Sequence, residues 1–545
     1  MSSEALHIAS CPTHPGEGEV RGDFVSLGGE AFYRIAHFDA MAPFFMSVVS
    51  GSDHWMFVSS NGGLSAGRRN SDRSLFPYYA VDQIHDAGDH TGPKTIVRVE
   101  RDGRRLLWEP FSPRGAGLYR TTRNLYKHVH GNVLVFEEVN EDLQLAFRYR
   151  WSPSGRFGWV RHSELENRRE GETSVEVLDG IQNLLPWGVA DEFQRTFSVL
   201  GDAHKQNELD SSTGLATFAL SSVPGDSTEP GESLRATVCW SSMPSSVTRL
   251  VSSEQVEAFR RGDDVQGETR VLGRRGAYFV VDTMTLAAGE TRDWLIVADL
   301  GYGASEATKL RRLLADEDRR KTAVLDDVAA NAQHLARIVA GADGMQMTGD
   351  HLGSVHHFAN VLFNVMRGGT FEHGYRVPRR DFRSYLHDQN REVATRHDGW
   401  TSTLPDWIGL ERLLEDARAQ GDAQLTRLVH GYLPLTFSRR HGDPSRPWNW
   451  YTIRVHDGED LVYGYEGNWR DIFQNWEALG ISYPGYLAQF ITVFLNASTA
   501  DGYNPYRITR KGIDWEVEDP DDPWSHIGYW GDHQIIYLLR LIEAW

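Results

Sequence analysis

The sequence has few cysteines and no long hydrophobic run. Of its 545 residues, only Cys11 and Cys239 are cysteine. A disulfide framework is therefore excluded, and a reducing compartment is indicated. No stretch approaches the roughly 18 consecutive apolar residues that a membrane-spanning helix needs. The N-terminal stretch lacks the basic and apolar regions of a secretion signal, so we expect a cytoplasmic protein that does not enter the membrane.

Positive charge is also scarce. Lys and Arg number 56 against 75 Asp and Glu, which gives a formal net charge of -19. Nucleic-acid binding and attachment to an anionic membrane both need a basic surface, so we expect neither partner. A small neutral substrate, or an anion held by a few local cations, is compatible with this charge.

Apolar and aromatic residues are abundant instead, at 40% and 11% of the chain. A chain of this length usually folds as two or three domains. Residues 1–302 contain many short runs typical of strands. Turn residues separate several of these runs, at Gly62-Gly63, Asp102-Gly103 and Gly289. We predict a large antiparallel β-sandwich for this region.

The hydrophobic spacing changes after residue 302. Leucines and valines then recur every three or four residues, as on one face of a helix. Ser305 is the predicted N-cap of this stretch, and Gly341 its end. We predict a helical linker over residues 303–345. The sequence leaves open whether this linker also forms a homodimer contact.

Residues 346–545 alternate between helical patterns and long polar, aromatic loops. Such loops in a compact domain usually carry function. Tryptophans gather in this part of the chain, at Trp448, Trp450, Trp469, Trp476, Trp515, Trp524 and Trp530. An aromatic ring can stack on the C–H face of a pyranose, while carboxylates and amides bind its hydroxyls. The group favours a saccharide site, although tryptophans that fill a helical core explain any single position equally well.

The segment Tyr465–Gly480, YEGNWRDIFQNWEALG, combines both features. At helical spacing its apolar side chains share one face. Arg470, Asp471, Gln474 and Asn475 form a polar stripe beside that face. This pattern predicts a half-buried helix that borders the site of a polar ligand.

Three segments resemble the cellobiose and chitobiose phosphorylase family, glycoside hydrolase family 94. They are DHWMFVSSNGGLSAGRR at 53–69, GNWRDIFQNWEALG at 467–480 and NASTADGYNPYRITRKGIDWEVEDPDDPWSHIGYWGDHQIIYLL at 496–539. The resemblance implies a β-sandwich, a helical linker and an (α/α)6 barrel, with an insertion around residues 370–445. It also implies that this chain holds only the first half of the barrel, in residues 346–545.

The resemblance implies roles for particular residues. Asp471 matches the aspartate that binds the donor sugar, and Arg454 matches an arginine that binds phosphate. A guanidinium group suits that role because its fork of donors fits a phosphate dianion. Asp532 matches one of the paired aspartates in the family's later block. The helix of Asp471 also carries Arg470, Gln474 and Asn475, which we expect to support or line the sugar site, and Trp530 is a further candidate for that site. Inorganic phosphate is the implied co-substrate, and no cofactor or metal is implied.

Three positions depart from the family pattern. Tyr465 replaces a second donor-binding arginine, and Asn475 and Gly531 replace aspartates. These departures indicate a donor site that differs from that of the family.

No match to the family's general acid is found in this chain, so the catalytic residue stays unassigned. An inverting phosphorylase needs one acid to protonate the leaving oxygen, because phosphate itself attacks the anomeric carbon. A hydrolase needs a second carboxylate that activates water. The insertion contributes four aspartates that are either the missing acid or members of structural ion pairs, Asp381, Asp388, Asp398 and Asp406.

We expect inverting phosphorolysis of a β-linked disaccharide or oligosaccharide to a sugar 1-phosphate. Two alternatives remain open. One is hydrolysis on the same scaffold, and the other is saccharide binding without turnover.

Overall fold

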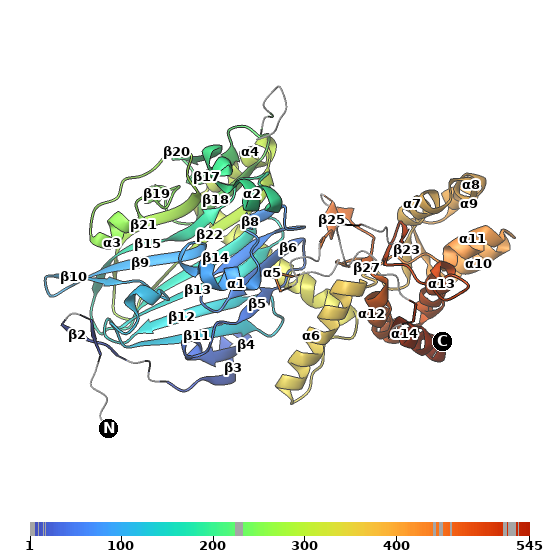
Figure 1. Ribbon diagram of the computed structural model, residues 1–545, viewed down its shortest axis with the longest axis horizontal. Coiled ribbons are helices and arrows are strands. Elements are labelled where there is room, and N and C mark those ends of the chain that lie inside the picture. The colour runs from blue at the N-terminus through green and yellow to red at the C-terminus, as the bar shows by residue number, and fades with distance from the viewer. Residues whose placement is uncertain are drawn as a thin grey trace. The chain divides into compact units, whose positions relative to one another are not determined.

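The computed structural model describes residues 6–545 except positions 9, 15, 17, 224–230, 232, 440–442, 446–450, 458–459, 516–519, 521–529 and 532. Contacts divide the chain into two compact units. One comprises Met1–Gln333 and Pro444–Pro447, and the other His334–Asp443 and Trp448–Trp545. Strands dominate the first and helices the second (Figure 1), and we call them the β unit and the helical unit.

The β unit is built from antiparallel sheets. The largest has eleven strands, in the spatial order β20 (Arg270–Leu272), β16 (Lys205–Asp210), β17 (Leu215–Leu220), β18 (Ala236–Ser241), β22 (Thr291–Tyr302), β14 (Gly158–Asn167), β13 (Leu145–Ser154), β12 (Leu134–Asn140), β11 (Thr121–His128), β4 (Glu30–Ala36) and β3 (Arg21–Leu27). A five-stranded sheet has the order β10 (Arg104–Trp108), β9 (Gly92–Arg101), β15 (Thr173–Leu184), β21 (Gly276–Leu286) and β19 (Thr248–Leu250). A four-stranded sheet contains β5 (Phe45–Val48), β6 (His54–Ser59), β7 (Leu64–Arg68) and β8 (Ser74–Phe76).

Smaller elements complete the β unit. They are the hairpin β1 (His7–Ile8) and β2 (Cys11–Pro12), the helices α1 (Val81–Asp86), α2 (Asp191–Ala203), α3 (Val256–Arg261) and α4 (Ala304–Leu314), and the 3-10 turns η1 (Phe38–Ala40), η2 (Ala87–Asp89) and η3 (Pro113–Gly115). Helix α5 (Glu317–Gly341) starts in the β unit, and its residues from His334 onward belong to the helical unit.

The three larger sheets share one hydrophobic core. Val97 and Tyr278 of the five-stranded sheet and Phe136 and Ile296 of the eleven-stranded sheet belong to the same buried cluster. These sheets therefore form the antiparallel β-sandwich that the turn pattern predicted. The predicted hairpin turns are present as well. Asp102 and Gly103, for example, have φ angles of 51° and 71°, the left-handed conformation of a two-residue turn between strands.

The predicted helical stretch consists of two helices, α4 and α5, and its start differs from the prediction. Helix α4 starts at Ala304, so Ser305 lies inside its first turn and is not the N-cap. The N-cap is Gly303, whose N–H donates to Glu306 Oε2 at 3.1 Å. A carboxylate that reaches back from the third helical position satisfies the free N–H as a serine would. Helix α5 ends at Gly341, as predicted.

A buried ionic cluster joins the four-stranded sheet to β22. Arg68 Nε lies 3.0 Å from Asp299 Oδ1 and donates to His54 Nε2 at 2.8 Å. Asp299 is only 3% exposed. Its burial, partly offset by the charge of Arg68, raises the pKa of Asp299 to about 6.

This pKa gives a testable pH dependence. The folded state binds the Asp299 proton more tightly than the unfolded chain does. Its contribution to stability is therefore largest below the ordinary pKa of 3.8 and is lost as the pH rises through about 6. Relative to Asp299→Asn, the wild-type free energy of unfolding should fall by about 2 kcal/mol over that interval and by about 3 kcal/mol over the complete titration. Urea unfolding at both ends of the interval measures the change. If the difference in unfolding free energy between wild type and Asp299→Asn stays constant with pH, the prediction is wrong. Asp264→Asn, a replacement at an exposed site, is the control.

The helical unit centres on one helix. Helix α12 (Trp469–Ser482) packs against α6 (His351–Gly368), α13 (Leu487–Ala497) and α14 (His533–Ala544). The remaining elements are α7 (Arg379–Gln389), α8 (Arg391–Arg396), α9 (Asp398–Thr403), α10 (Leu410–Ala419), α11 (Ala423–His430), η4 (Pro484–Tyr486) and the strand groups β23–β24 (Arg376–Pro378, Trp407–Gly409), β25–β26 (His456–Asp457, Asp460–Leu461) and β27–β28–β29 (Glu466–Asn468, Arg507–Thr509, Gly512–Asp514).

The segment between α6 and α12 contains a closed insertion. Thr370 and Thr436 form an antiparallel bridge, and each N–H donates to the other's carbonyl at 3.0 Å. Ser438 Oγ adds a hydrogen bond to Arg367 O at 3.0 Å. Helices α7 to α11 lie between the two bridged residues. The chain therefore leaves and re-enters the helical scaffold at one place, and α6 and α12 still pack together.

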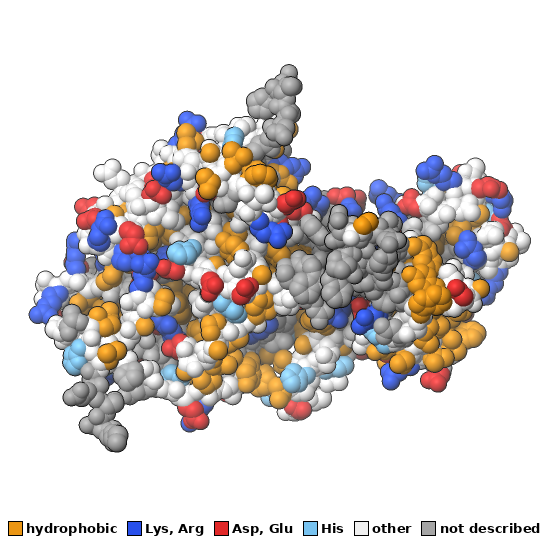
Figure 2. All heavy atoms as spheres, viewed as in Figure 1, with side chains coloured by type: hydrophobic (Ala, Val, Ile, Leu, Met, Phe, Trp, Pro, Cys, Tyr) orange, Lys and Arg blue, Asp and Glu red, His pale blue; other side chains and the backbone are white. Residues whose placement is uncertain are grey.

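Helix α14 has one buried and one exposed apolar face. Leu538 and Leu541 are buried, whereas Ile536 and Leu539 are more than half exposed. Figure 2 shows hydrophobic side chains gathered over this helix. Among the described residues, no helix is both long and apolar enough to cross a membrane.

Candidate functional site

A small sheet fixes the beginning of α12. Strand β27 pairs antiparallel with β28, with Glu466 opposite Thr509 and Asn468 opposite Arg507. The N–H of Trp469, the first helical residue, donates to Tyr506 O at 2.9 Å. The loop after α13 therefore determines where α12 starts and where the side chains of its first turn lie.

The apolar face of α12 is buried as its spacing predicted. Trp469, Phe473 and Trp476 are fully buried. The Trp476 indole N–H donates to Gly368 O at 2.9 Å, and its ring stacks on Phe490 at 5.1 Å. These tryptophans pack the helical core, so they do not provide a sugar platform.

Asp471 lies in the first turn of α12 and forms a pair with a histidine. His533 Nε2, at the start of α14, is 3.3 Å from Asp471 Oδ1, and the two side chains are 30% and 43% exposed. The positive end of the helix dipole favours a carboxylate at this position. Asp471 is therefore an oriented, solvent-accessible acceptor, as binding a sugar hydroxyl requires.

Three aromatic rings gather on the loops that precede His533. Trp515 stacks on Tyr503 with centroids 5.7 Å apart, and Trp530 contacts the same tyrosine at 5.0 Å. Trp515 and Trp530 are 40% and 60% exposed. The buried Asn504 side chain holds this arrangement by donating to Trp530 O at 3.2 Å. Exposed rings of this kind can pack against the apolar face of a sugar.

The other predicted sugar-site residues of α12 differ in position. Arg470 and Gln474 are exposed, whereas Asn475 is only 6% exposed. The Asn475 side chain donates to Asp471 O at 3.1 Å within its own helix. Asn475 therefore supports the backbone at Asp471.

Arg454 and Asp532 complete the predicted set. Arg454 has an exposed side chain between the buried Ile453 and Val455. Within the described part of the chain, no contact joins Arg454 to Asp471. Asp532 lies outside the described residues, as do three of the tryptophans noted in the sequence, Trp448, Trp450 and Trp524.

Three of the four aspartates of the insertion pair with arginines, and the fourth lies beside a histidine. Asp381 accepts from Arg510 Nη1 at 2.7 Å and from Tyr432 OH at 2.6 Å. The other pairs are Asp398 with Arg383, Asp406 with Arg379, and Asp388 with His387. Of the two alternatives that the sequence left open, these contacts match structural ion pairs.

Two residues of this site escaped sequence reasoning. His533 was not expected beside Asp471, because 62 positions separate them. Tyr503, the ring that both exposed tryptophans contact, was also not singled out. Both lie within the segment 496–539 that carries the family resemblance, which was the available signal. Within the described ranges, no group of three or more His, Cys, Asp or Glu side chains could hold a metal ion.

One protein family matches part of the chain. Residues 371–434 match the model of glycoside hydrolase family 149 insertion domain 1. The match lies inside the insertion around residues 370–445 that the family resemblance implied, and it ends two residues before the bridging Thr436. No curated protein matches the sequence.

The solved structures that match this chain do so weakly and share little sequence with it. A bacterial glucoamylase complexed with acarbose has a TM-score of 0.36 and 8% identity, over 90% of this chain and 61% of its own. A protein described as a kojibiose phosphorylase from human microbiome has a TM-score of 0.29 and 9% identity, over 63% of this chain and 39% of its own. This chain thus spans less than two thirds of the length of either, and TM-scores this low do not establish a common fold.

Proposed function

We propose that the chain is part of a carbohydrate-active enzyme of the inverting glycoside phosphorylase type. Its substrate is a β-linked disaccharide or oligosaccharide, and its product is a sugar 1-phosphate. In this proposal the helical unit is part of an (α/α)6 barrel, the saccharide binds at the first turn of α12, and inorganic phosphate is the co-substrate.

The observation that carries the proposal is the match of residues 371–434 to an insertion domain of glycoside hydrolase family 149. The bridge between Thr370 and Thr436 closes the base of this insertion. Helices α6 and α12 pack together on either side of that base. A carbohydrate-enzyme scaffold that carries such an insertion accounts for this arrangement.

The geometry around Asp471 supports a saccharide as the ligand. An ionised carboxylate accepts hydrogen bonds from hydroxyls, and His533 at 3.3 Å restrains its orientation. The exposed rings of Trp515 and Trp530 offer apolar surfaces on the loops next to α14. A sugar presents both a hydroxyl rim and an apolar face, so it can use both features.

The reaction type follows from phosphate as the nucleophile. A phosphate oxygen forms the new bond to the anomeric carbon, the glycosidic C–O bond breaks, and an acid protonates the departing oxygen. No second carboxylate is needed to activate water. Arg454 is the proposed phosphate ligand because its guanidinium is exposed and can bind a dianion through two donors.

Product analysis with and without phosphate tests this proposal. The protein is incubated with cellobiose or cellotetraose, sugar 1-phosphate is followed by phosphorus NMR, and free sugar by a reducing-end assay. We expect sugar 1-phosphate only when phosphate is present. Arg454→Ala should raise the KM for phosphate by about ten-fold through loss of a charge-assisted contact. Arg391→Ala, at an exposed arginine of the insertion, should leave it unchanged.

Two outcomes contradict the proposal. Equal release of free sugar without phosphate would identify a hydrolase. Saccharide binding with neither product would identify a binding protein without turnover.

A further inference from the structure

We propose a second saccharide-binding site in a cavity of the β unit. The cavity has a volume of about 460 Å³, which lies within the range of small-molecule sites, roughly 300–1,000 Å³. Lys94 and Thr95 of β9 line it from the five-stranded sheet, and Phe136 of β12 and Tyr149 of β13 from the eleven-stranded sheet. The cavity therefore opens between the two layers of the sandwich. It does not involve Asp471 or any other residue of the helical unit.

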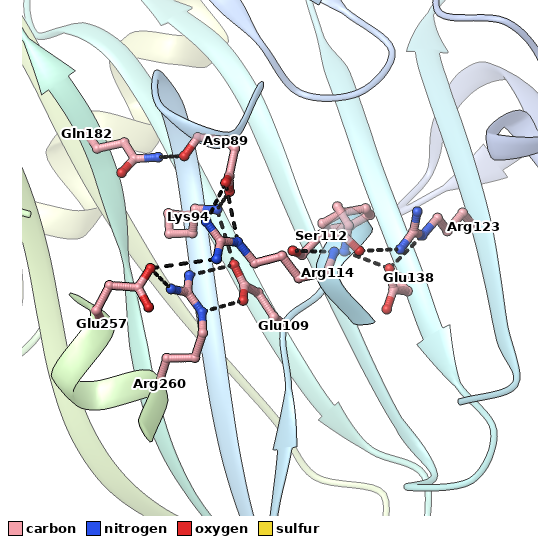
Figure 3. Close-up of polar contacts among 11 residues, drawn as sticks. Asp89, Lys94, Glu109, Ser112, Arg114, Arg123, Glu138, Gln182, Glu257 and Arg260 are labelled. Atoms are coloured by element: carbon pink, nitrogen blue, oxygen red, sulfur yellow. Dashed lines mark hydrogen bonds and ion pairs between the residues drawn. The ribbon is translucent and has the colours of Figure 1, made fainter. Parts of the chain in front are cut away.

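The cations that line the cavity are already neutralised by the protein. Lys94 Nζ lies 2.5 Å from Asp89 Oδ1 and 3.1 Å from Glu109 Oε1. Arg123 Nε lies 2.7 Å from Glu138 Oε2. Figure 3 shows these pairs as parts of one network around the cavity wall. Each lysine or arginine that lines the cavity is already paired with a carboxylate. An anionic ligand would therefore gain little electrostatic stabilisation in this cavity.

The network extends to residues behind the wall. Arg114 Nη2 lies 2.8 Å from Asp89 Oδ2, and Arg260 of α3 lies 2.8 Å from Glu109 (Figure 3). Burial alone would raise the pKa of Asp89, but hydrogen bonds from Lys94 and Arg114 outweigh it and lower the pKa to about 2. Asp89 is therefore ionised at any physiological pH, and the charge pattern of the wall is constant.

An aromatic cluster provides the apolar side of the cavity. Phe136 and Tyr149 are stacked with centroids 4.9 Å apart, and Phe111 meets Tyr149 edge-on at 5.3 Å. Phe38 joins the cluster through Phe136 at 6.0 Å. Phe38, Phe136 and Tyr149 are themselves buried, so the half-buried ring of Phe111 presents the apolar surface that can face the C–H side of a sugar ring.

Two further carboxylates line the cavity and face solvent. Asp39 and Asp86 are exposed and, among the described residues, make no ion pair or side-chain hydrogen bond. Each can accept hydroxyl donors without breaking an internal contact. A neutral ligand with an apolar face and several hydroxyls satisfies both sides of the cavity. The choice of a saccharide among such ligands rests on the proposed function.

Hydrogen exchange followed by mass spectrometry locates the site. Cellotetraose is added to the full chain, to the Asp471→Ala variant and to Met41→Trp, which places an indole at a residue that is part of the cavity lining. We expect protection of peptides covering 85–95 and 109–113 in the wild type and in Asp471→Ala. Met41→Trp should weaken cellotetraose binding at these peptides by about ten-fold or more, a loss of about 1.4 kcal/mol. Met347→Trp adds the same ring at a fully exposed position and should leave the protection of these peptides by cellotetraose unchanged.

The outcomes separate this proposal from the one for α12. Protection at 85–95 and 109–113 that persists in Asp471→Ala supports the cavity whether or not the helical unit binds sugar. No protection of these peptides, or protection that Met41→Trp leaves intact, overturns the cavity proposal. Equal protection by trigalacturonate, an anionic saccharide, would overturn the assignment of a neutral ligand.

Discussion

Replacing Asp471 with alanine is expected to weaken saccharide binding in the helical unit roughly ten- to hundred-fold. The carboxylate is the charged acceptor of the proposed site, and hydrogen bonds to charged groups contribute more than neutral ones. Isothermal titration with cellotetraose, combined with hydrogen exchange of α12 peptides, measures the change at this site and separates it from the cavity of the β unit.

The same variant should remain folded. Asp471 is 43% exposed, and its removal costs the interaction with the helix dipole, about 0.5 kcal/mol, and the partly exposed contact with His533, which contributes about 1 kcal/mol or less. Glu477→Ala removes another carboxylate of α12, one that pairs with Arg540 at 3.5 Å, and should bind cellotetraose normally. Unchanged affinity of Asp471→Ala would remove Asp471 from the site and, with it, the proposed position of the donor sugar.

Replacing Asp179 with alanine is expected to destabilise the β unit by about 3–5 kcal/mol. Asp179 on β15 and Arg161 on β14 form an ion pair at 2.6 Å, with both side chains fully buried. Thr95 and Trp294 also donate to this carboxylate, at 2.6 and 2.8 Å. Without it, the guanidinium stays buried and unpaired, which is far more costly than the loss of an exposed pair.

Urea unfolding of the wild type and three variants measures this effect. Glu100→Ala, which removes an exposed pair with Arg105 on the same sheet, should change the unfolding free energy by less than about 0.5 kcal/mol. The double replacement Arg161→Met and Asp179→Leu should recover most of the loss, because both charges leave the core together. If Asp179→Ala lowers the unfolding free energy by as little as Glu100→Ala does, the buried pair is dispensable for stability.

The Asp179 network also supports the proposed cavity. Thr95, which lines the cavity, donates to Asp179 and accepts from Arg161 Nη2 at 3.1 Å. The Arg161 guanidinium lies 4.8 Å from the Tyr149 ring. Loss of Asp179 is therefore expected to disturb two lining residues at once, so this variant is a poor probe of ligand binding and Met41→Trp is the better one.

Local features of the fold were predictable from the sequence, whereas one helix cap was not. The hairpin at Asp102-Gly103 depends on two adjacent residues that tolerate positive φ. The buried face of α12 depends on spacing within a single helix. The N-cap at Gly303 was missed because serine is the commoner cap, whereas here Glu306 satisfies the free N–H.

The candidate site was predictable only in part. Asp471 could be identified from the sequence because it is a charged residue in a helix rich in aromatic residues. The 14 residues of that helix are consecutive, so the pattern is local. Its partner His533 is 62 positions away, and the cavity of the β unit combines residues from both sheets and four connecting segments. No spacing rule brings such residues together, because their proximity depends on how the strands are ordered and how the helices pack.

The sequence by itself thus determined the strand-rich and helix-rich regions, the main turns and the buried face of α12. These follow from interactions between residues a few positions apart. The tertiary structure decided which polar side chains meet, which charges are neutralised by neighbours and where a cavity remains. Those outcomes depend on contacts between distant segments, whose free energy is set by burial and pairing in the folded chain.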